Sequence, residues 1–149
     1  MQTLQQFSNN RNGIEMTPNL HPLLNTTLAI QVHTASALFA IIVTLLIFTR
    51  PRGSRAHRML GWIWVGAMLT VAVTSFGITH GGPVLGYGWI HLLSVWVIAG
   101  IIYALVQIRR GQTARHRGMM LGMVWGGLVI AGLFTLSPGR IMHAVLIGG

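Results

Sequence analysis

Histidine is the residue type that carries most of the chemistry available to this sequence. The chain has seven histidines, a single acidic residue, Glu15, and no cysteine. One carboxylate cannot supply the acid pair of a glycoside hydrolase, an oxygen cage for calcium or magnesium, or an acidic proton relay across a membrane. The lack of cysteine excludes disulfides, thiolate metal sites and iron–sulfur clusters. The histidine side chains are therefore the main remaining candidates for binding or catalysis.

The strongest candidates are His33 and His91, which lie inside long uncharged stretches and are each followed at the same spacing by a serine, Ser36 and Ser94. A polar ring inside a membrane costs free energy unless it finds a partner, so such histidines are candidates for function. Two equivalent imidazoles can approach one central object from opposite sides, as the axial ligands of haem b do. A quinone head group, another metal, and plain hydrogen bonding between helices stay open as alternatives.

Three further residues are expected near the same end of the molecule: His80, Arg140 and His143. The guanidinium of Arg140 can pair bidentately with a haem propionate or a lipid phosphate. The two histidines can instead join His33 and His91 as ligands of copper or zinc. An interfacial anchor for the tail is the simpler role for Arg140, so these residues are secondary candidates for cofactor binding.

Two histidine–arginine pairs stand just before apolar stretches, His57 with Arg58 and His116 with Arg117. About 36 Å of helix separates His57 from His33, which puts these pairs at the opposite membrane face. We expect them to bind lipid headgroups. A second haem at this shallow, wet position is the alternative.

The composition identifies the elements that must position these residues. Hydrophobic residues make up 52% of the 149 residues and charged residues only 7%, against about 25% charged in a typical soluble domain. The chain is therefore expected to be one integral membrane domain. The predicted parts are a polar tail (1–25), a membrane domain (26–139) with spans at about 26–48, 59–80, 86–108 and 118–136, and a second tail (140–149). The breaker cluster Gly81-Gly82-Pro83 divides the second and third spans.

The arginines indicate orientation. Eight of the ten lie in the connections after the first and third spans: Arg50, Arg52, Arg55, Arg58, Arg109, Arg110, Arg115 and Arg117. The positive-inside rule places both connections in the cytoplasm, and hence both termini outside the inner membrane. The first 25 residues lack the basic start and cleavage site of a secretory leader, so the first span is expected to be retained. The high basicity then reflects orientation and not nucleic-acid binding.

The second half of the chain echoes the first. His33 to Gly53 and His91 to Gly111 both span 20 residues, and Trp64 corresponds to Trp125 further on. Both halves run in the same direction, which predicts an all-α, four-helix bundle of two parallel-repeat helical hairpins. Small residues on the fourth span (Gly118, Gly122, Gly126) and on the second (Gly66, Thr70, Thr74, Gly77, Gly81) are expected to mark helix packing.

Several motifs give a resemblance: H-R-M-L-G-W at 57–62, H-L-L-S-V-W at 91–96, R-H-R-G-M-M at 115–120, and A-G-L-F-T-L-S-P-G-R-I-M-H at 131–143. Over roughly residues 28–147 the chain resembles a family of predicted bacterial membrane proteins catalogued as a domain of unknown function. That resemblance implies an inner-membrane protein of four or more helices and no particular activity. In layout alone, the chain is similar to four-helix b-type haem cytochromes.

The expected function is electron transfer or quinone-linked redox chemistry through haem b near the outer face. The alternative is a non-catalytic accessory subunit or lipid-binding protein, and whether the chain is an enzyme stays open. Expected partners are membrane lipids, a quinone or redox partner protein, and a further copy of the chain. Nucleic acid is not among them.

Overall fold

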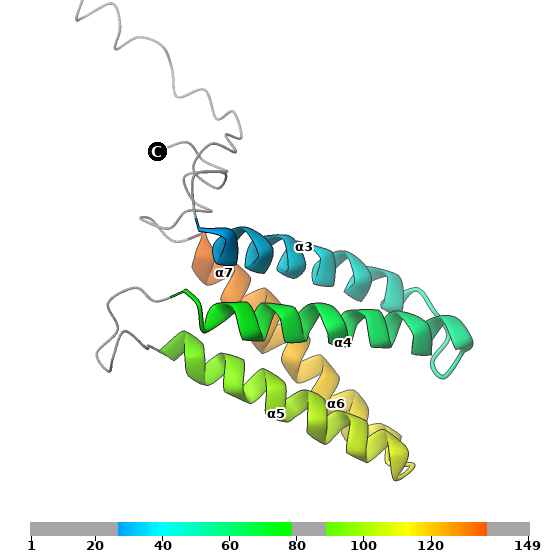
Figure 1. Cartoon of the computed structure of the whole chain (residues 1–149). Coiled ribbons are helices and arrows are strands. Elements are labelled where there is room, and N and C mark those ends of the chain that lie inside the picture. Colours follow the sequence, from blue (N-terminus) through cyan, green and yellow to red (C-terminus); the bar gives the residue numbers. More distant parts are fainter. Residues whose placement is uncertain (1–26, 79–88, 137–149) are drawn as a thin grey trace, which may run out of the picture. The chain divides into compact units, whose positions relative to one another are not determined.

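The computed structural model describes residues 27–78 and 89–136, and all regular structure in those two ranges is helical. Its elements are α3 (Leu28–Phe48), α4 (Arg55–Ser75), α5 (Trp89–Arg109), α6 (Thr113–Met123), the π-helix η1 (Val124–Ile130) and α7 (Ala131–Thr135) (Figure 1). Four stretches are long and apolar enough to cross a membrane: Leu28–Phe48, Arg55–Ser75, His91–Arg109 and Thr113–Thr135. The expected all-α architecture with four candidate spans is confirmed.

Two helices begin earlier than their apolar stretches. We expected the second span to begin near residue 59, but α4 begins at Arg55, because the Ser54 hydroxyl accepts a hydrogen bond from the backbone N–H of His57 at 3.1 Å and caps the helix. α6 likewise begins at Thr113, before the predicted start at 118. Helical backbone can continue into the headgroup region, where long arginine side chains reach water. The first charged residues therefore do not mark the ends of these helices.

The two connections that carry the arginines are built alike. Residues 49–54 join α3 to α4 and residues 110–112 join α5 to α6, both at the same end of the helices in Figure 1. Each turn contains a glycine with positive φ, Gly53 at 79° and Gly111 at 74°. This left-handed conformation is costly for a residue with a Cβ atom. The glycines thus allow the chain to reverse sharply.

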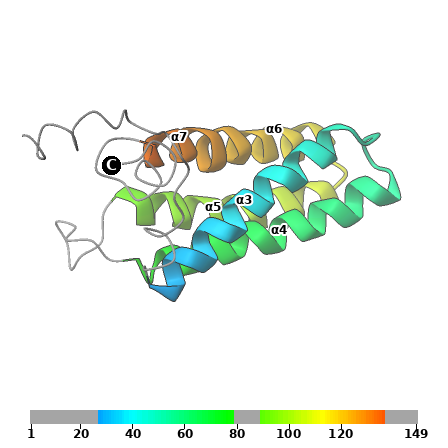
Figure 2. The ribbon, with the colours of Figure 1, turned by 90° about the horizontal axis from the view of Figure 1, so that it is seen from above.

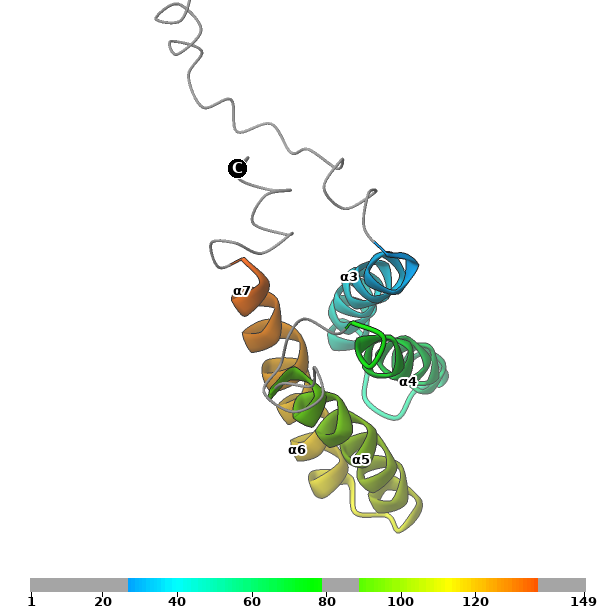
Figure 3. The ribbon, with the colours of Figure 1, turned by 60° about the vertical axis from the view of Figure 1, so that its left-hand side comes forward.

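The helices of the unit Thr26–Leu133 pack as two hairpins. α3 packs mainly on α4, and α5 on α6; α4 also packs on α5, while α3 meets the fourth span more thinly through η1. Figures 2 and 3 show α4 beside both α3 and α5. Around the bundle the order is α3, α4, α5 and the fourth span, so α3 and α5 are diagonal.

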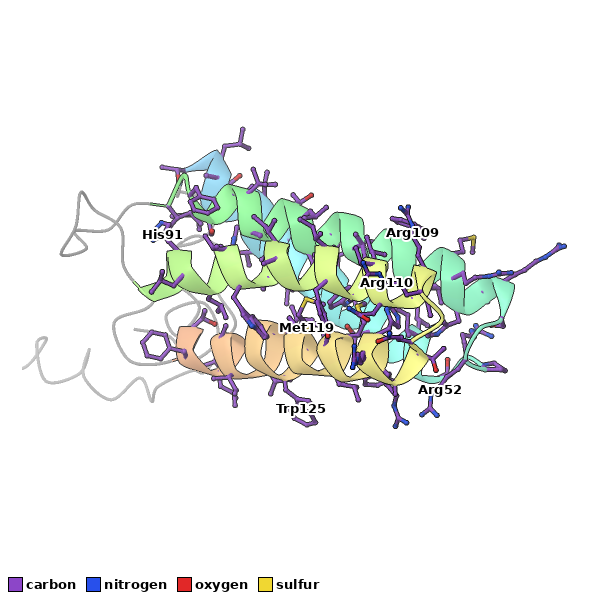
Figure 4. The ribbon with its side chains drawn as sticks, turned by 90° about the horizontal axis from the view of Figure 1, so that it is seen from below. Arg52, His91, Arg109, Arg110, Met119 and Trp125 are labelled. Atoms are coloured by element: carbon purple, nitrogen blue, oxygen red, sulfur yellow. The ribbon has the colours of Figure 1, made fainter. Side chains whose placement is uncertain are left out.

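A polar link runs through the apolar core between α3 and α4. Trp64 is 1% exposed, and its indole nitrogen donates to the Thr44 hydroxyl at 2.8 Å. The same hydroxyl donates to the backbone carbonyl of Ala40 at 2.7 Å. Trp125, the counterpart of Trp64 in the sequence echo, is 61% exposed and points away from the other helices (Figure 4). The two halves therefore differ at this position.

The small-residue stripes only partly mark helix contacts. A Cβ added to Gly126 would lie 3.4 Å from Trp96, and one added to Gly77 would lie 3.5 Å from Ala29, as packing requires. The expectation is wrong for Gly66, Gly118 and Gly122, where an added Cβ would meet no described neighbour within 4 Å. Gly66 and Gly118 are exposed and Gly122 is half-buried in the described part of the chain. The tightest approach falls at Gly100 of α5, which packs against Met119 and Met123.

Candidate functional site

His33 projects from α3 onto α4. Its Nδ1 lies 3.0 Å from the carbonyl oxygen of Val71 and 3.3 Å from the Thr74 hydroxyl oxygen. A carbonyl can only accept, so Nδ1 carries the proton and donates it. In the neutral imidazole, Nε2 then keeps its lone pair. This is the tautomer of metal-binding histidines, whose second nitrogen commonly donates to a backbone carbonyl.

His91 lies near the start of α5 and is 6% exposed. Its ring packs against Phe76, the residue that follows α4, with the ring centroids 5.8 Å apart and the planes at 44°. The Nε2 atom of His91 is buried within the protein. The aromatic contact limits how the imidazole can turn.

Ser94 lies one turn after His91 and joins α5 to α4. Its hydroxyl lies 2.5 Å from that of Ser75, which in turn donates to the Ala72 carbonyl at 2.7 Å. The two hydroxyls thus share one hydrogen bond between the helices. Ser36, the sequence counterpart of Ser94, is half-buried on α3. One serine of the pair is thus an interhelical link.

The contacts of both histidines fall on one short stretch of α4. His33 reaches Val71 and Thr74 from α3, and His91 reaches Phe76 from α5. Because α3 and α5 are diagonal, the two imidazoles approach this end of the bundle from different sides. The other expected residues here, His80, Arg140 and His143, lie outside the described residues. Within residues 27–78 and 89–136, no three His, Cys, Asp or Glu side chains form a group that can hold a metal ion.

The opposite end of the bundle carries the arginine-rich connections, with Arg52, Arg109 and Arg110 far from His91 (Figure 4). Of the predicted headgroup residues, Arg58 and Arg117 are exposed. His116 is engaged within the protein, because its Nδ1 lies 3.0 Å from the Ala104 carbonyl oxygen. The Nδ1 of His57 is buried and has no hydrogen-bond partner among the described residues. The two histidines, matched in sequence, therefore differ in their contacts.

The sequence interpretation missed one buried polar residue, Gln107. It is 5% exposed, and its Oε1 has no hydrogen-bond partner in the described part of the chain. It completes the buried stripe of α5, formed by His91, Ser94, Val97, Ile101, Ala104 and Gln107. A signal was present, since Gln107 is the one amide in the uncharged stretch that begins at His91 and continues its three- to four-residue spacing.

Comparison with known proteins agrees with the membrane architecture. Residues 30–142 match a family model described as a predicted membrane protein, DUF2306. Neither the curated proteins nor the solved structures give a match. The matched segment takes in both hairpins and covers well over half of the chain. The chain therefore belongs to the DUF2306 family of predicted membrane proteins.

Proposed function

We propose that this chain binds haem b at the end of the bundle opposite the arginines, with His33 and His91 as axial ligands, and that it serves in electron transfer or quinone-linked redox chemistry. The observation that carries the proposal is the bond from His33 Nδ1 to the Val71 carbonyl. It fixes the imidazole in the form that ligates a metal and makes the ligating nitrogen more basic.

The donor set fits haem iron. Two neutral imidazoles are ordinary axial ligands of b-type haem, and cofactors in helical bundles are held by side chains on facing helices. His33 and His91 reach the same stretch of α4 from diagonal helices.

Each residue has a distinct role in this proposal. Val71 and Thr74 hold the His33 ring at its Nδ1 edge, and Phe76 restrains the His91 ring. The Ser75–Ser94 bond ties α4 to α5 beside the site and so fixes the distance between the two ligands. Bound haem supplies one-electron chemistry, while the low exposure of His91 keeps water from that ligand.

The proposal includes the parallel repeat. The glycines with positive φ at equivalent places in the two turns support it, as do the two hairpin pairings. Superposing residues 28–80 on 86–139 of an experimental structure should require a rotation of about 180° around the membrane normal. A different rotation axis would reject the repeat.

An absorption spectrum of the detergent-purified protein tests the haem assignment. We expect a Soret band, with low-spin α and β bands after reduction. His33→Ala or His91→Ala should abolish haem binding or make it high-spin, whereas His57→Ala at the opposite end should leave the spectrum unchanged. A protein that stays colourless after expression with added haem precursor would overturn the proposal and favour the accessory or lipid-binding role.

A further inference from the structure

The arginine end of the bundle carries a large positive charge, with no acidic side chain in the described residues to balance it. Its eight arginines, Arg50, Arg52, Arg55, Arg58, Arg109, Arg110, Arg115 and Arg117, are all exposed. The single acid of the sequence is Glu15, so residues 27–78 and 89–136 contain no acidic side chain. Guanidinium groups bind phosphate through two parallel hydrogen bonds. This surface is therefore complementary to a phosphate-bearing partner.

Two buried polar groups lie on the inner faces at the same end. α4 and α5 run antiparallel, since Ser75 near the end of α4 meets Ser94 near the start of α5. The start of α4 and the end of α5 therefore lie at the same end of the bundle, with His57 about 7.5 Å further along the helix axis from the serine contact than Gln107. Neither His57 Nδ1 nor Gln107 Oε1 has a hydrogen-bond partner in the described parts of the chain.

Such groups need an explanation, because a buried polar atom without a partner costs about 1–3 kcal/mol. The second hairpin shows how the chain can satisfy a histidine at this end of the bundle, since His116 bonds to the Ala104 carbonyl. The first hairpin does not do the same for His57. Gln107 is the more informative of the two, because an amide oxygen only accepts and therefore needs a donor.

We infer that this end of the bundle binds an anionic phospholipid whose headgroup carries a hydroxyl, as that of phosphatidylglycerol does. Arginines hold the phosphate, and the headgroup hydroxyl donates to Gln107 Oε1. A phosphodiester alone does not meet the second requirement, since its ionised oxygens carry no proton and can only accept. Because Oε1 is enclosed by side chains, the headgroup displaces one of them on entering. The site is separate from the proposed haem site and does not depend on it.

A matched pair of lipids tests the inference. Phosphatidylglycerol and phosphatidylmethanol carry the same single negative charge, but only the first has headgroup hydroxyls. The full-length protein is placed in phosphatidylcholine nanodiscs with equal amounts of the two lipids, and the lipids retained after detergent extraction are counted by native mass spectrometry. We expect phosphatidylglycerol to be retained about fivefold over phosphatidylmethanol, the ratio that one hydrogen bond of typical net strength gives.

Variants test whether Gln107 causes the preference for phosphatidylglycerol. Gln107→Leu should retain both lipids equally, while Gln112→Leu, an exposed glutamine at the same end, should keep the wild-type ratio. Replacing Arg55 and Arg58 together with glutamine should lower the retention of both lipids to the same extent. Circular dichroism checks the fold of each variant.

Three outcomes would overturn the inference. The first is equal retention of the two lipids by the wild-type protein, which needs no variant and so does not depend on variant folding. The second is an unchanged ratio in Gln107→Leu, or in Gln107→Met if the leucine variant does not fold. The third is displacement of both lipids by a short-chain quinone, which would assign Gln107 to a quinone head group. The Soret band should be unaffected throughout, so this result is distinguishable from failure of the haem proposal.

Discussion

Replacing Thr44 with valine should destabilise the bundle through a single polar link. Valine matches the shape of threonine, so the core volume is kept and only the hydroxyl is lost. That hydroxyl accepts from Trp64 at 2.8 Å and donates to Ala40 at 2.7 Å. Trp64 is 1% exposed, and no water reaches its N–H to replace the lost acceptor. A buried donor without a partner costs about 1–3 kcal/mol, whereas hydrogen bonds between membrane helices average about 0.6 kcal/mol. We expect a loss of about 1–2 kcal/mol.

A double-mutant cycle separates the bond from other effects. Trp64→Phe removes the donor, and the pair Thr44→Val with Trp64→Phe removes both partners, so the difference isolates their coupling. We expect a coupling of about 0.6–1.7 kcal/mol. Unfolding in mixed micelles of increasing SDS content, followed by circular dichroism, gives the four free energies. Thr44→Ser should stay closer to the wild type, because it keeps the hydroxyl. A valine variant as stable as the wild type, or a coupling near zero, would refute the argument.

Three further predictions concern topology and the glycines. A reporter enzyme fused after Gly149 should be active in the periplasm, since the positive-inside rule predicts that the two connections with eight arginines lie in the cytoplasm. Reporter activity in the cytoplasm would contradict this orientation. Gly100→Ala should destabilise the bundle by about 1–2 kcal/mol in the SDS titration, because the new methyl group would overlap the end of Met119 and come within 3.0 Å of the Met123 sulfur. The control is Gly118→Ala, at an exposed position, which should change the free energy of unfolding by less than about 0.5 kcal/mol. Gly53→Ala should cost about 1 kcal/mol in the same titration, since its φ is 79°; an unchanged midpoint would show that the turn can relax.

The span count could be predicted from sequence because it depends on local chemistry. Uncharged stretches long enough to cross a bilayer, separated by arginine clusters and the Gly-Gly-Pro breaker, leave few alternatives. The starting residues of α4 and α6 could not be placed as well, since hydropathy reports the apolar boundary while the backbone follows the cap at Ser54. The Ser54 side chain was a usable signal, because serine is a favoured cap.

The contacts at the candidate sites could be predicted only in part. The sequence identifies His33 and His91 as unusual, but nothing local shows that the former bonds to the Val71 carbonyl or that the latter packs on Phe76. Those contacts depend on how the helices are rotated against each other. The same limit explains the error over Gly118 and Gly122, since spacing shows that small residues share a face but not which face meets a neighbour.

The π-helix η1 makes the fourth span sensitive to its own length. A π-turn holds one residue more than an α-turn, so Val124–Ile130 acts as a stored insertion within an otherwise regular helix. Deleting one residue there would let the segment revert to α-helix without a break in the backbone. The helix after the deletion would keep nearly its present face, because the wide turn already absorbs the extra residue, whereas the same deletion in a regular α-helix turns everything after it by about 100°. Leu133, which is 64% exposed, would stay on the exposed face. The fourth span can therefore lose one residue without redirecting its C-terminal end, which a regular helix of the same composition cannot do.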